Sequence, residues 1–376
     1  MTASGRTVTA SELATRVLEP EDFVADTEAF VDVRIERSKG KASYSFVGPG
    51  VSQNADQHIS IAEPHGFNVG AATMPHGIYN NAHLHYTPEV FICTKGDWRI
   101  DIGRKREQSV ELSPDTIFSA PTWVFRGFEN TGPDDGFLFV VLGGDDTGGI
   151  IWEPEVLREA AETGMYLGRD NSLVDGRNGD VPSDVLQPLS DAQLAGIDSY
   201  TTDELDERLV RPDGLCWTSA GLLSTVLGPQ HSVELAPVIG YGLSQDRRSR
   251  PPICTPHGFA VEWLRANPGA STGLHRHDDS QVVLLVDGDW EVALNEPAQE
   301  VSTRPVMGSL ASIPASAWRD LRNIGTSPAR AVIVTGGDSP SRVEWPAQTL
   351  VRAADAGFGL DAAGYVAPLE LLGTGS

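Results

Sequence analysis

The side chains in this sequence best suited to chemistry are two pairs of histidines, each with one residue between its members. His83 and His85 lie in the segment GIYNNAHLHYTPEVFICTKG, and Glu89 follows four positions after His85. Alternate residues of a β-strand project to the same side, so the two imidazoles are expected to face together. Two imidazoles and a carboxylate can hold one face of a metal ion and leave other positions for water, oxygen or substrate. The segment therefore predicts a metal site with open positions, which is typical of catalysis.

The second pair, His275 and His277, lies in the segment GASTGLHRHDDSQVVLLVDG, where Gln281 stands at the position of the glutamate. A neutral amide oxygen holds a divalent ion more weakly than a carboxylate does. We therefore expect the first segment to belong to the catalytic site. The second segment is expected to be either a weak metal site or part of a barrel with only a structural role.

Both segments belong to a repeat that covers most of the chain. A shift of 192 residues places Thr9 on Thr201 and the segment EPHGF on TPHGF, and after one inserted residue the shift becomes 193. Such extended agreement indicates a tandem duplication. The predicted organisation is an N-terminal unit at 1–164, a polar connection at 165–200 and a C-terminal unit at 201–376.

Within each unit the pattern predicts strands rather than helices. Short alternating or β-branched runs such as VFICTKGDWRIDIG are separated by Gly, Pro, Asn and Asp, which favours an antiparallel sandwich or barrel. Capping boxes at Thr9 and Thr201 indicate a short opening helix in each unit. A closing helix is expected near residues 153–163 and 346–356.

The spacing of Gly77, His83, His85, Glu89 and Gly96 resembles the first motif of the cupin superfamily. Together with the duplication, the resemblance implies a bicupin. The expected fold is therefore all-β, with two tandem cupin (jelly-roll) β-barrels and short flanking helices. Because cupins include enzymes, sugar binders, regulators and storage proteins, this resemblance does not name a reaction.

The second cupin motif lacks its histidine in both units, where Arg126 and Arg319 stand instead. A guanidinium remains protonated and does not ligate a cation. If a metal binds His83, His85 and Glu89, then Arg126 is a candidate catalytic residue that holds a carboxylate or enolate of the substrate. If no metal binds, Arg126 is expected to pair with Glu89. The second candidate site comprises His275, His277, Gln281 and Arg319.

Other side chains were considered for the same site. A further histidine ligand could come only from upstream of the motifs, from His65 or His257, or less readily from His76. Alternatively, His65 and His257 lie in turns in which the imidazole bonds a backbone carbonyl. Trp123 replaces the small residue of the second motif, so it either packs, narrows the cavity or stacks on a flat substrate. Tyr79 is a further substrate-binding candidate.

These observations favour a mononuclear non-haem Fe(II) dioxygenase that acts on a small anionic or enolisable substrate. One alternative is a redox-neutral isomerase or lyase with Mn, Ni or Zn, in which His76 or Tyr79 serves as the base. Another is a bicupin that binds a small ligand without turnover.

Charge and composition narrow the choice of partners. The net charge of −24 disfavours nucleic acid and anionic membranes. The sequence shows no apolar leader and no spanning run, so we expect a cytoplasmic protein with a small-molecule substrate. Family resemblance slightly favours a homodimer, and a monomer stays open. The three cysteines are too few and too far apart for a disulfide framework.

Overall fold

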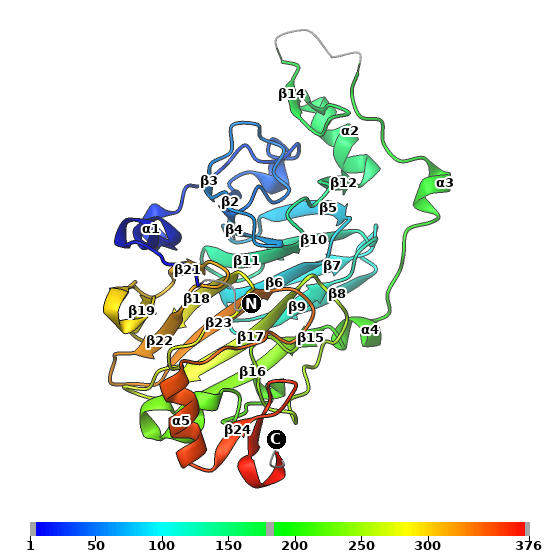
Figure 1. Cartoon of the computed structure of the whole chain (residues 1–376). Helices are drawn as coiled ribbons and strands as arrows, with labels where there is room; N and C mark the ends of the chain where they lie inside the picture. Colours follow the sequence, from blue (N-terminus) through cyan, green and yellow to red (C-terminus); the bar gives the residue numbers. More distant parts are fainter. Residues whose placement is uncertain (1–4, 178–183, 373–376) are drawn as a thin grey trace. The chain divides into compact units, whose positions relative to one another are not determined.

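The computed structural model describes residues 5–177 and 184–372, and it separates into two compact units. One unit runs from Val24 to Asp213; the other joins the residues up to Phe23 to those from Gly214 onward. Both units consist mainly of antiparallel strands (Figure 1). The expected all-β fold with two tandem barrels is therefore confirmed.

The N-terminal unit contains a seven-stranded sheet in the order β15-β9-β6-β11-β4-β2-β3 and a five-stranded sheet in the order β12-β5-β10-β7-β8. Side chains from both sheets meet in one apolar core, where Phe128 contacts Phe91 and Trp98 edge-on or at a tilt. The strands of the unit are β2 (Ala42–Val47), β3 (Ile59–Ile61), β4 (Phe67–Met74), β5 (Tyr79–His85), β6 (Glu89–Lys95), β7 (Trp98–Ile102), β8 (Gln108–Leu112), β9 (Ile117–Ala120), β10 (Arg126–Asn130), β11 (Gly136–Gly143), β12 (Ile150–Trp152), β13 (Met165–Leu167), β14 (Leu173–Asp175) and β15 (Leu209–Val210). Its helices are α2 (Pro154–Glu162), α3 (Asp191–Leu194) and α4 (Thr202–Asp206).

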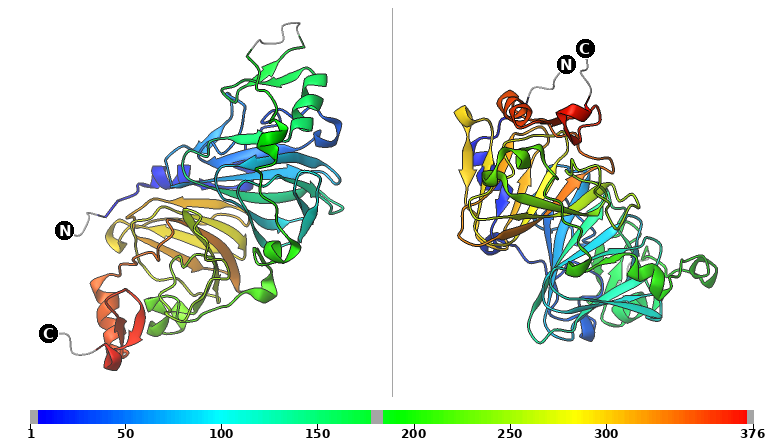
Figure 2. Two further views of the ribbon diagram at one scale, coloured as in Figure 1. Left: turned by 90° about the vertical axis from the view of Figure 1, so that its right-hand side faces the viewer. Right: turned by 90° about the horizontal axis from the view of Figure 1, so that it is seen from below.

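The C-terminal unit contains a six-stranded sheet in the order β1-β21-β18-β23-β17-β16 and a three-stranded sheet in the order β20-β19-β22. Its strands between residues 259 and 336, drawn from yellow to orange in Figure 2, contribute to an apolar core that includes Leu264, Val283 and Trp290. The strands are β1 (Val17–Leu18), β16 (Val233–Ile239), β17 (Phe259–Ala266), β18 (Gln281–Asp287), β19 (Trp290–Leu294), β20 (Val301–Thr303), β21 (Leu310–Ile313), β22 (Arg319–Asn323), β23 (Ala329–Gly336), β24 (Phe358–Leu360) and β25 (Val366–Pro368). Its helices are α1 (Ala10–Arg16) and α5 (Ala347–Asp355).

The opening segments of the two repeats are exchanged between the units. Strand β1 pairs with β21, so the start of the first repeat completes the C-terminal unit. Strand β15 pairs with β9, so the start of the second repeat completes the N-terminal unit. The unit boundaries therefore differ from the expected limits at 164 and 201, because each opening strand forms its ladder with the barrel of the other repeat.

The helix signals agree with the structure. Thr9 accepts a hydrogen bond from the Glu12 amide at the start of α1, and Thr201 forms a reciprocal capping box with Glu204 at the start of α4. The closing helices α2 and α5 lie where they were expected. No helix within the described ranges is long and apolar enough to cross a membrane.

The segment expected to be an unmatched polar connection carries structure at its start. Strands β13 and β14 pair after α2, as β24 and β25 pair after α5. Met165 and Leu167 are buried in an apolar cluster with Trp152. The repeat therefore extends about ten residues further than predicted; residues 178–183 of the segment lie outside the described part.

Candidate metal centre and its cavity

His83, His85 and Glu89 come together in the N-terminal barrel. Their potential ligand atoms lie within 4.8 Å of one another, and the residues are 4%, 0% and 3% exposed. Within residues 5–177 and 184–372 this is the only group of three or more His, Cys, Asp or Glu side chains with such geometry.

The local backbone explains how the trio forms. His83 and His85 lie on strand β5 with one residue between them, and a turn at Tyr86–Pro88 leads to Glu89, the first residue of β6. The register between β5 and β10 shifts between Asn80 and His83, which is a β-bulge. The bulge allows Asn80 to line the same cavity as both histidines.

The side chains present the atoms that a metal ion requires. His83 Nδ1 lies 2.7 Å from the carbonyl oxygen of Asn81; donation to this oxygen directs the lone pair of Nε2 toward the centre. Neither ring nitrogen of His85 nor Oε2 of Glu89 has a hydrogen-bond partner within the described ranges, although all three atoms are buried. Buried polar atoms without partners are rare and costly. A divalent metal would satisfy Oε2 of Glu89 and one ring nitrogen of His85, so the residues fit such an ion.

The charge states also suit a cation. Burial, reinforced by the charge of Arg126, lowers the pKa of His83 to about 3. Burial likewise holds the pKa of His85 well below its usual value. Both imidazoles are therefore neutral at physiological pH and have a lone pair to offer. Burial raises the pKa of Glu89 to about 7, and the Arg126 guanidinium opposes that rise.

Arg126 lies beside Glu89 and is not among the residues that line the cavity. Its Nε is 3.8 Å from Oε2 of Glu89, one of its terminal nitrogens donates to the carbonyl of Pro121, and the side chain is fully buried. The expected arrangement in which Arg126 faces the substrate is therefore not seen. The arginine forms an ion pair with Glu89, but Nε and Nη1 of Arg126 have no hydrogen-bond partner within the described residues.

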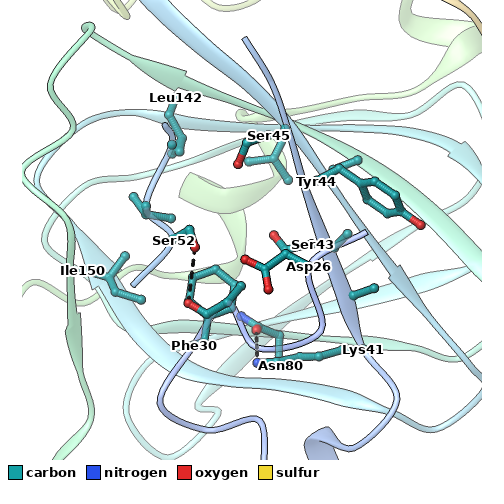
Figure 3. A pocket seen from close by; sticks show the side chains of 18 of the residues that line it. Asp26, Phe30, Lys41, Ser43, Tyr44, Ser45, Ser52, Asn80, Leu142 and Ile150 are labelled. Atoms are coloured by element: carbon teal, nitrogen blue, oxygen red, sulfur yellow. Dashed lines mark hydrogen bonds between the residues drawn. The ribbon is translucent and has the colours of Figure 1, made fainter. Parts of the chain in front are cut away.

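A cavity opens beside the trio. Its volume is about 810 Å³ including the open mouth, and its wall includes His83, His85 and Glu89. The partly exposed lining residues Asp26 and Ser52 mark the mouth, whereas the trio forms the buried end. Figure 3 shows Asp26, Phe30, Lys41 and Asn80 around the space.

One wall of the cavity carries a buried ion pair that the motif analysis missed. Lys41 is 6% exposed and contacts Asp32, which is 0% exposed. Lys41 also donates to Oδ1 of Asn80 at 2.7 Å (Figure 3). Burial alone raises the pKa of Asp32, but the Lys41 ammonium and hydrogen bonds from Lys41 and Asn81 outweigh it, so this pKa lies below its ordinary value. The carboxylate is therefore charged and holds the ammonium in place.

The other predicted site residues lie elsewhere. Tyr79 is buried outside the cavity lining, under the guanidinium of Arg106, because the β-bulge separates it from the facing histidines. Trp123 is 42% exposed and meets Tyr86 edge-on; it is also outside the lining. Its backbone has φ of 53°, in the left-handed region that few residues other than glycine adopt.

The additional histidines considered as ligands occupy turns. Nδ1 of His65 lies 2.6 Å from the carbonyl of Glu63, and Nδ1 of His257 has the same contact with Thr255. His76 is bonded to the carbonyl of Gly132. None of the three belongs to the cluster of ligand atoms, so the turn alternative describes the first two.

The second candidate site is closed by its arginine. Arg319 donates from Nη1 to Nε2 of His277 at 2.8 Å and from Nη2 to the carbonyl of Pro314. Gln281 bonds Thr335 and lies 3.5 Å from the same nitrogen of His277. The atom that would bind a metal is therefore already an acceptor for a permanent cation.

The side chains at the cavity positions differ in size between the two barrels, although the strands pair in the same register. Ser43 pairs with Ala72 in the N-terminal barrel, and Leu235 pairs with Leu264 at the corresponding place in the C-terminal barrel. Ser43 and Ala72 line the cavity, whereas both leucines belong to the apolar core. Lys41 likewise corresponds to Val233, a residue of that core. This difference between the repeats is a sequence signal that could have located the cavity.

Known proteins support the fold. A model of the Cupin domain family matches residues 263–335. The oxalate decarboxylase of Lactobacillus farciminis, solved with formate, is 12% identical with a TM-score of 0.55 and covers 89% of each chain. A structure of the Bacillus subtilis oxalate decarboxylase concerned with its Mn(II) centres is 13% identical, with a TM-score of 0.53, over 93% of this chain and 83% of that one. Vicilin from Corylus avellana (hazelnut) is 12% identical, with a TM-score of 0.50, over 86% of each chain.

No curated protein matches the sequence. At this level of identity the structural likenesses establish the fold and leave the reaction open. The family match, the duplicated motif and the two barrels agree with one another. The chain therefore has the two-barrel fold of bicupins, and its second barrel contains the match to the Cupin domain family.

Proposed function

We propose that the N-terminal barrel is a mononuclear metal enzyme that acts on a small organic acid. The observation that carries the proposal is the buried trio His83, His85 and Glu89, whose unpartnered atoms face one end of a cavity. A metal held by three protein ligands keeps positions open for substrate, as catalytic sites require.

Within this proposal a non-haem Fe(II) dioxygenase is the first candidate. Two histidines and one carboxylate are the ligand set of such enzymes. Bound iron would supply redox chemistry with oxygen and would bind a chelating acid. His83 is oriented by the carbonyl of Asn81, and Arg126 holds the carboxylate of Glu89. Apolar walls that include Phe128 and Leu142 keep bulk water from the reacting end.

A redox-neutral lyase is the second candidate, with Mn, Ni or Zn as a Lewis acid. Its support is the similarity in fold to oxalate decarboxylases, one of which is described by its Mn(II) centres. Such a reaction needs a proton donor or acceptor in the cavity. His76 and Tyr79 lie outside the lining, whereas Lys41 and Asp26 lie within it. Those two side chains are the groups that a lyase of this architecture would have to use.

Metal analysis and oxygen dependence test the proposal together. The protein is purified without added metal, analysed for Fe, Mn, Ni and Zn, and reconstituted with each. We expect about one metal per chain, lost on His83→Ala with His85→Ala and retained on the matched change His275→Ala with His277→Ala.

The reaction is then sought with a panel of organic acids in air and under argon. Consumption of oxygen by the Fe(II) form supports the dioxygenase. Equal turnover under argon, with release of carbon dioxide, supports the lyase. A protein that binds metal and acids without turnover is a ligand-binding bicupin, and the absence of metal binding after reconstitution contradicts both enzymes.

A further inference from the structure

The buried pair Lys41 and Asp32 is a costly feature in a cavity wall. Two charges are removed from water, and a buried ion pair commonly adds little stability compared with apolar residues of similar size. The C-terminal barrel offers that comparison within the same chain. At the corresponding positions it has Val233 and Ser224, and both are buried.

The pair is also not required to orient the metal ligands. In the N-terminal barrel Asp32 accepts hydrogen bonds from Asn81, whose carbonyl is bonded by His83. In the C-terminal barrel His275 has the same 2.7 Å contact with the carbonyl of Gly273, although the positions of Lys41 and Asp32 are occupied there by Val233 and Ser224. Neither folding of the barrel nor orientation of the metal ligands therefore explains why Lys41 and Asp32 are charged residues.

Lys41 retains a donor for a ligand. Among the residues that line the cavity it is the only lysine or arginine. Its ammonium has three N–H groups, and Asp32 and Asn80 accept two of them. Around the ammonium the lining also supplies the rings of Phe30 and Trp152, with Nζ 5.1 and 5.9 Å from the ring centroids. A carboxylate in the cavity could accept the remaining N–H group and enter a charge-assisted hydrogen bond.

The rest of the wall indicates the kind of acid. Apolar side chains, including Val140 and Leu142, line the space between the polar groups. Asp26 lies at the mouth, where its carboxylate bonds the amide of Glu28 and the side chain of Asn54. A negative charge at the mouth disfavours a second anionic group there. An acid with two anionic ends would therefore direct one to the metal and the other to Lys41.

We propose that Lys41, held by Asp32, is the subsite for the second carboxylate of a dicarboxylic acid with an apolar body, whose first carboxylate binds the metal. The inference rests on the proposed metal site and adds the substrate class. It predicts an acid with a carbon chain between its carboxylates, unlike oxalate, because apolar side chains line the cavity beside these groups.

The test compares dicarboxylates with their mono-methyl esters. Oxalate, succinate and adipate, with each mono-methyl ester, are titrated by calorimetry into the full chain loaded with Mn(II). The wild type is expected to bind succinate or adipate roughly tenfold or more tightly than the corresponding ester, the range of a hydrogen bond to a charged group. Oxalate is expected to bind more weakly than the preferred longer acid.

The variant Asp32→Ser with Lys41→Val copies the second barrel and removes both charges together, so no unpaired charge remains buried. It is expected to lose the preference for acid over ester; both ligands are compared on the same Mn(II)-loaded protein, so a change in Mn(II) affinity through Asn81 does not alter this ratio. Lys41→Arg keeps the positive charge and is expected to keep the preference. Retention of the preference in the double variant, or equal binding of acid and ester by the wild type, overturns the inference.

Failure of the metal site is distinguishable from failure of the subsite. If Mn(II) does not bind the wild type, the proposed function fails. The acids are then titrated into the metal-free chain, where Lys41 is still available to one carboxylate. Weaker binding of the acids by the double variant than by the wild type supports the inference, and equal binding by the two proteins overturns it.

Discussion

In the N-terminal barrel Ser43 and Ala72 face each other across an open cavity, whereas in the C-terminal barrel Leu235 and Leu264 meet at the same register within the core. The backbone around these positions is alike. The amide oxygen of Gln53 accepts hydrogen bonds from Val31 and Trp152, and that of Gln245 accepts them from Leu223 and Trp345. One hydrogen-bonded framework therefore supports both an open interior and a filled one.

The comparison separates the residues that make the fold from those that make the site. Framework residues such as Gln53 occur in both repeats, so they are explained by the barrel itself. Lys41, Asp32 and Glu89 occur in the first repeat alone, where their counterparts are Val233, Ser224 and Gln281. Charges that the C-terminal barrel replaces with neutral residues are not part of the framework that the two repeats share. They point to binding and chemistry in the N-terminal barrel.

The largest effect is expected from Glu89→Gln, which gives the first trio the composition of the second. The carboxylate supplies the only negative charge among the three ligands, and an amide oxygen is a poorer donor for a divalent ion. Affinity for Fe(II) or Mn(II) is expected to fall by roughly a hundredfold or more, since even outer-shell changes cost tenfold to a hundredfold. Metal titration of the purified chains measures the loss, and unchanged affinity would contradict the assignment of Glu89 as a ligand.

A smaller effect is expected from filling the cavity with Ser43→Leu and Ala72→Leu. The two leucines reproduce the pair in the second barrel and occupy space beside the metal site. Affinity for organic acids is expected to fall roughly tenfold or more, within the range by which small changes in pocket size discriminate ligands. Metal affinity is expected to remain, because neither position contributes a ligand atom. Parallel calorimetry with metal and with acids checks both parts; simultaneous loss of the two would indicate a general disturbance of the barrel.

The affinity for metal is also expected to depend on pH, and the pKa of Glu89 determines the pH range in which the affinity changes. Its pKa is about 7 in the metal-free site, whereas that of His83 is about 3. Below pH 7 the bound proton must leave Glu89 before a metal binds, so affinity falls as pH falls, by about tenfold per pH unit. The histidines are already neutral there and add nothing to the slope. Titrations between pH 5 and 8 measure it, and a flat profile below pH 7 would show that Glu89 is ionised without metal.

Much of the fold could be predicted from the sequence, because it rests on patterns that repeat. The first copy of the histidine motif located β5 and β6, the second located β18, and the Thr-x-x-Glu boxes located α1 and α4. The exchange of β1 and β15 between the barrels was missed, because a strand of two residues forms its ladder with partners that no local pattern identifies.

The site was predictable only in part. His83, His85 and Glu89 meet because strand alternation and one turn determine their geometry. Tyr79 was predicted to bind substrate, but a β-bulge changes which side chains of the strand face the cavity. The sequence pattern gives little indication of such a bulge. Lys41 and Asp32 lie about forty residues before the motif, so only the comparison of the repeats, where Val233 and Ser224 replace them, marks them as unusual.

The last prediction is that Gln281→Glu leaves the metal content unchanged. Restoring the carboxylate would be sufficient if the missing charge were the sole difference between the trios. Nε2 of His277, however, already accepts a hydrogen bond from Arg319, and burial lowers the pKa of that guanidinium only to about 9. The arginine thus remains charged at neutral pH, and the new carboxylate is expected to pair with it rather than with a metal ion. Elemental analysis should still give about one metal per chain. Two metals per chain would show that Arg319 moves away from His277, and that Gln281 alone prevents the second barrel from binding metal.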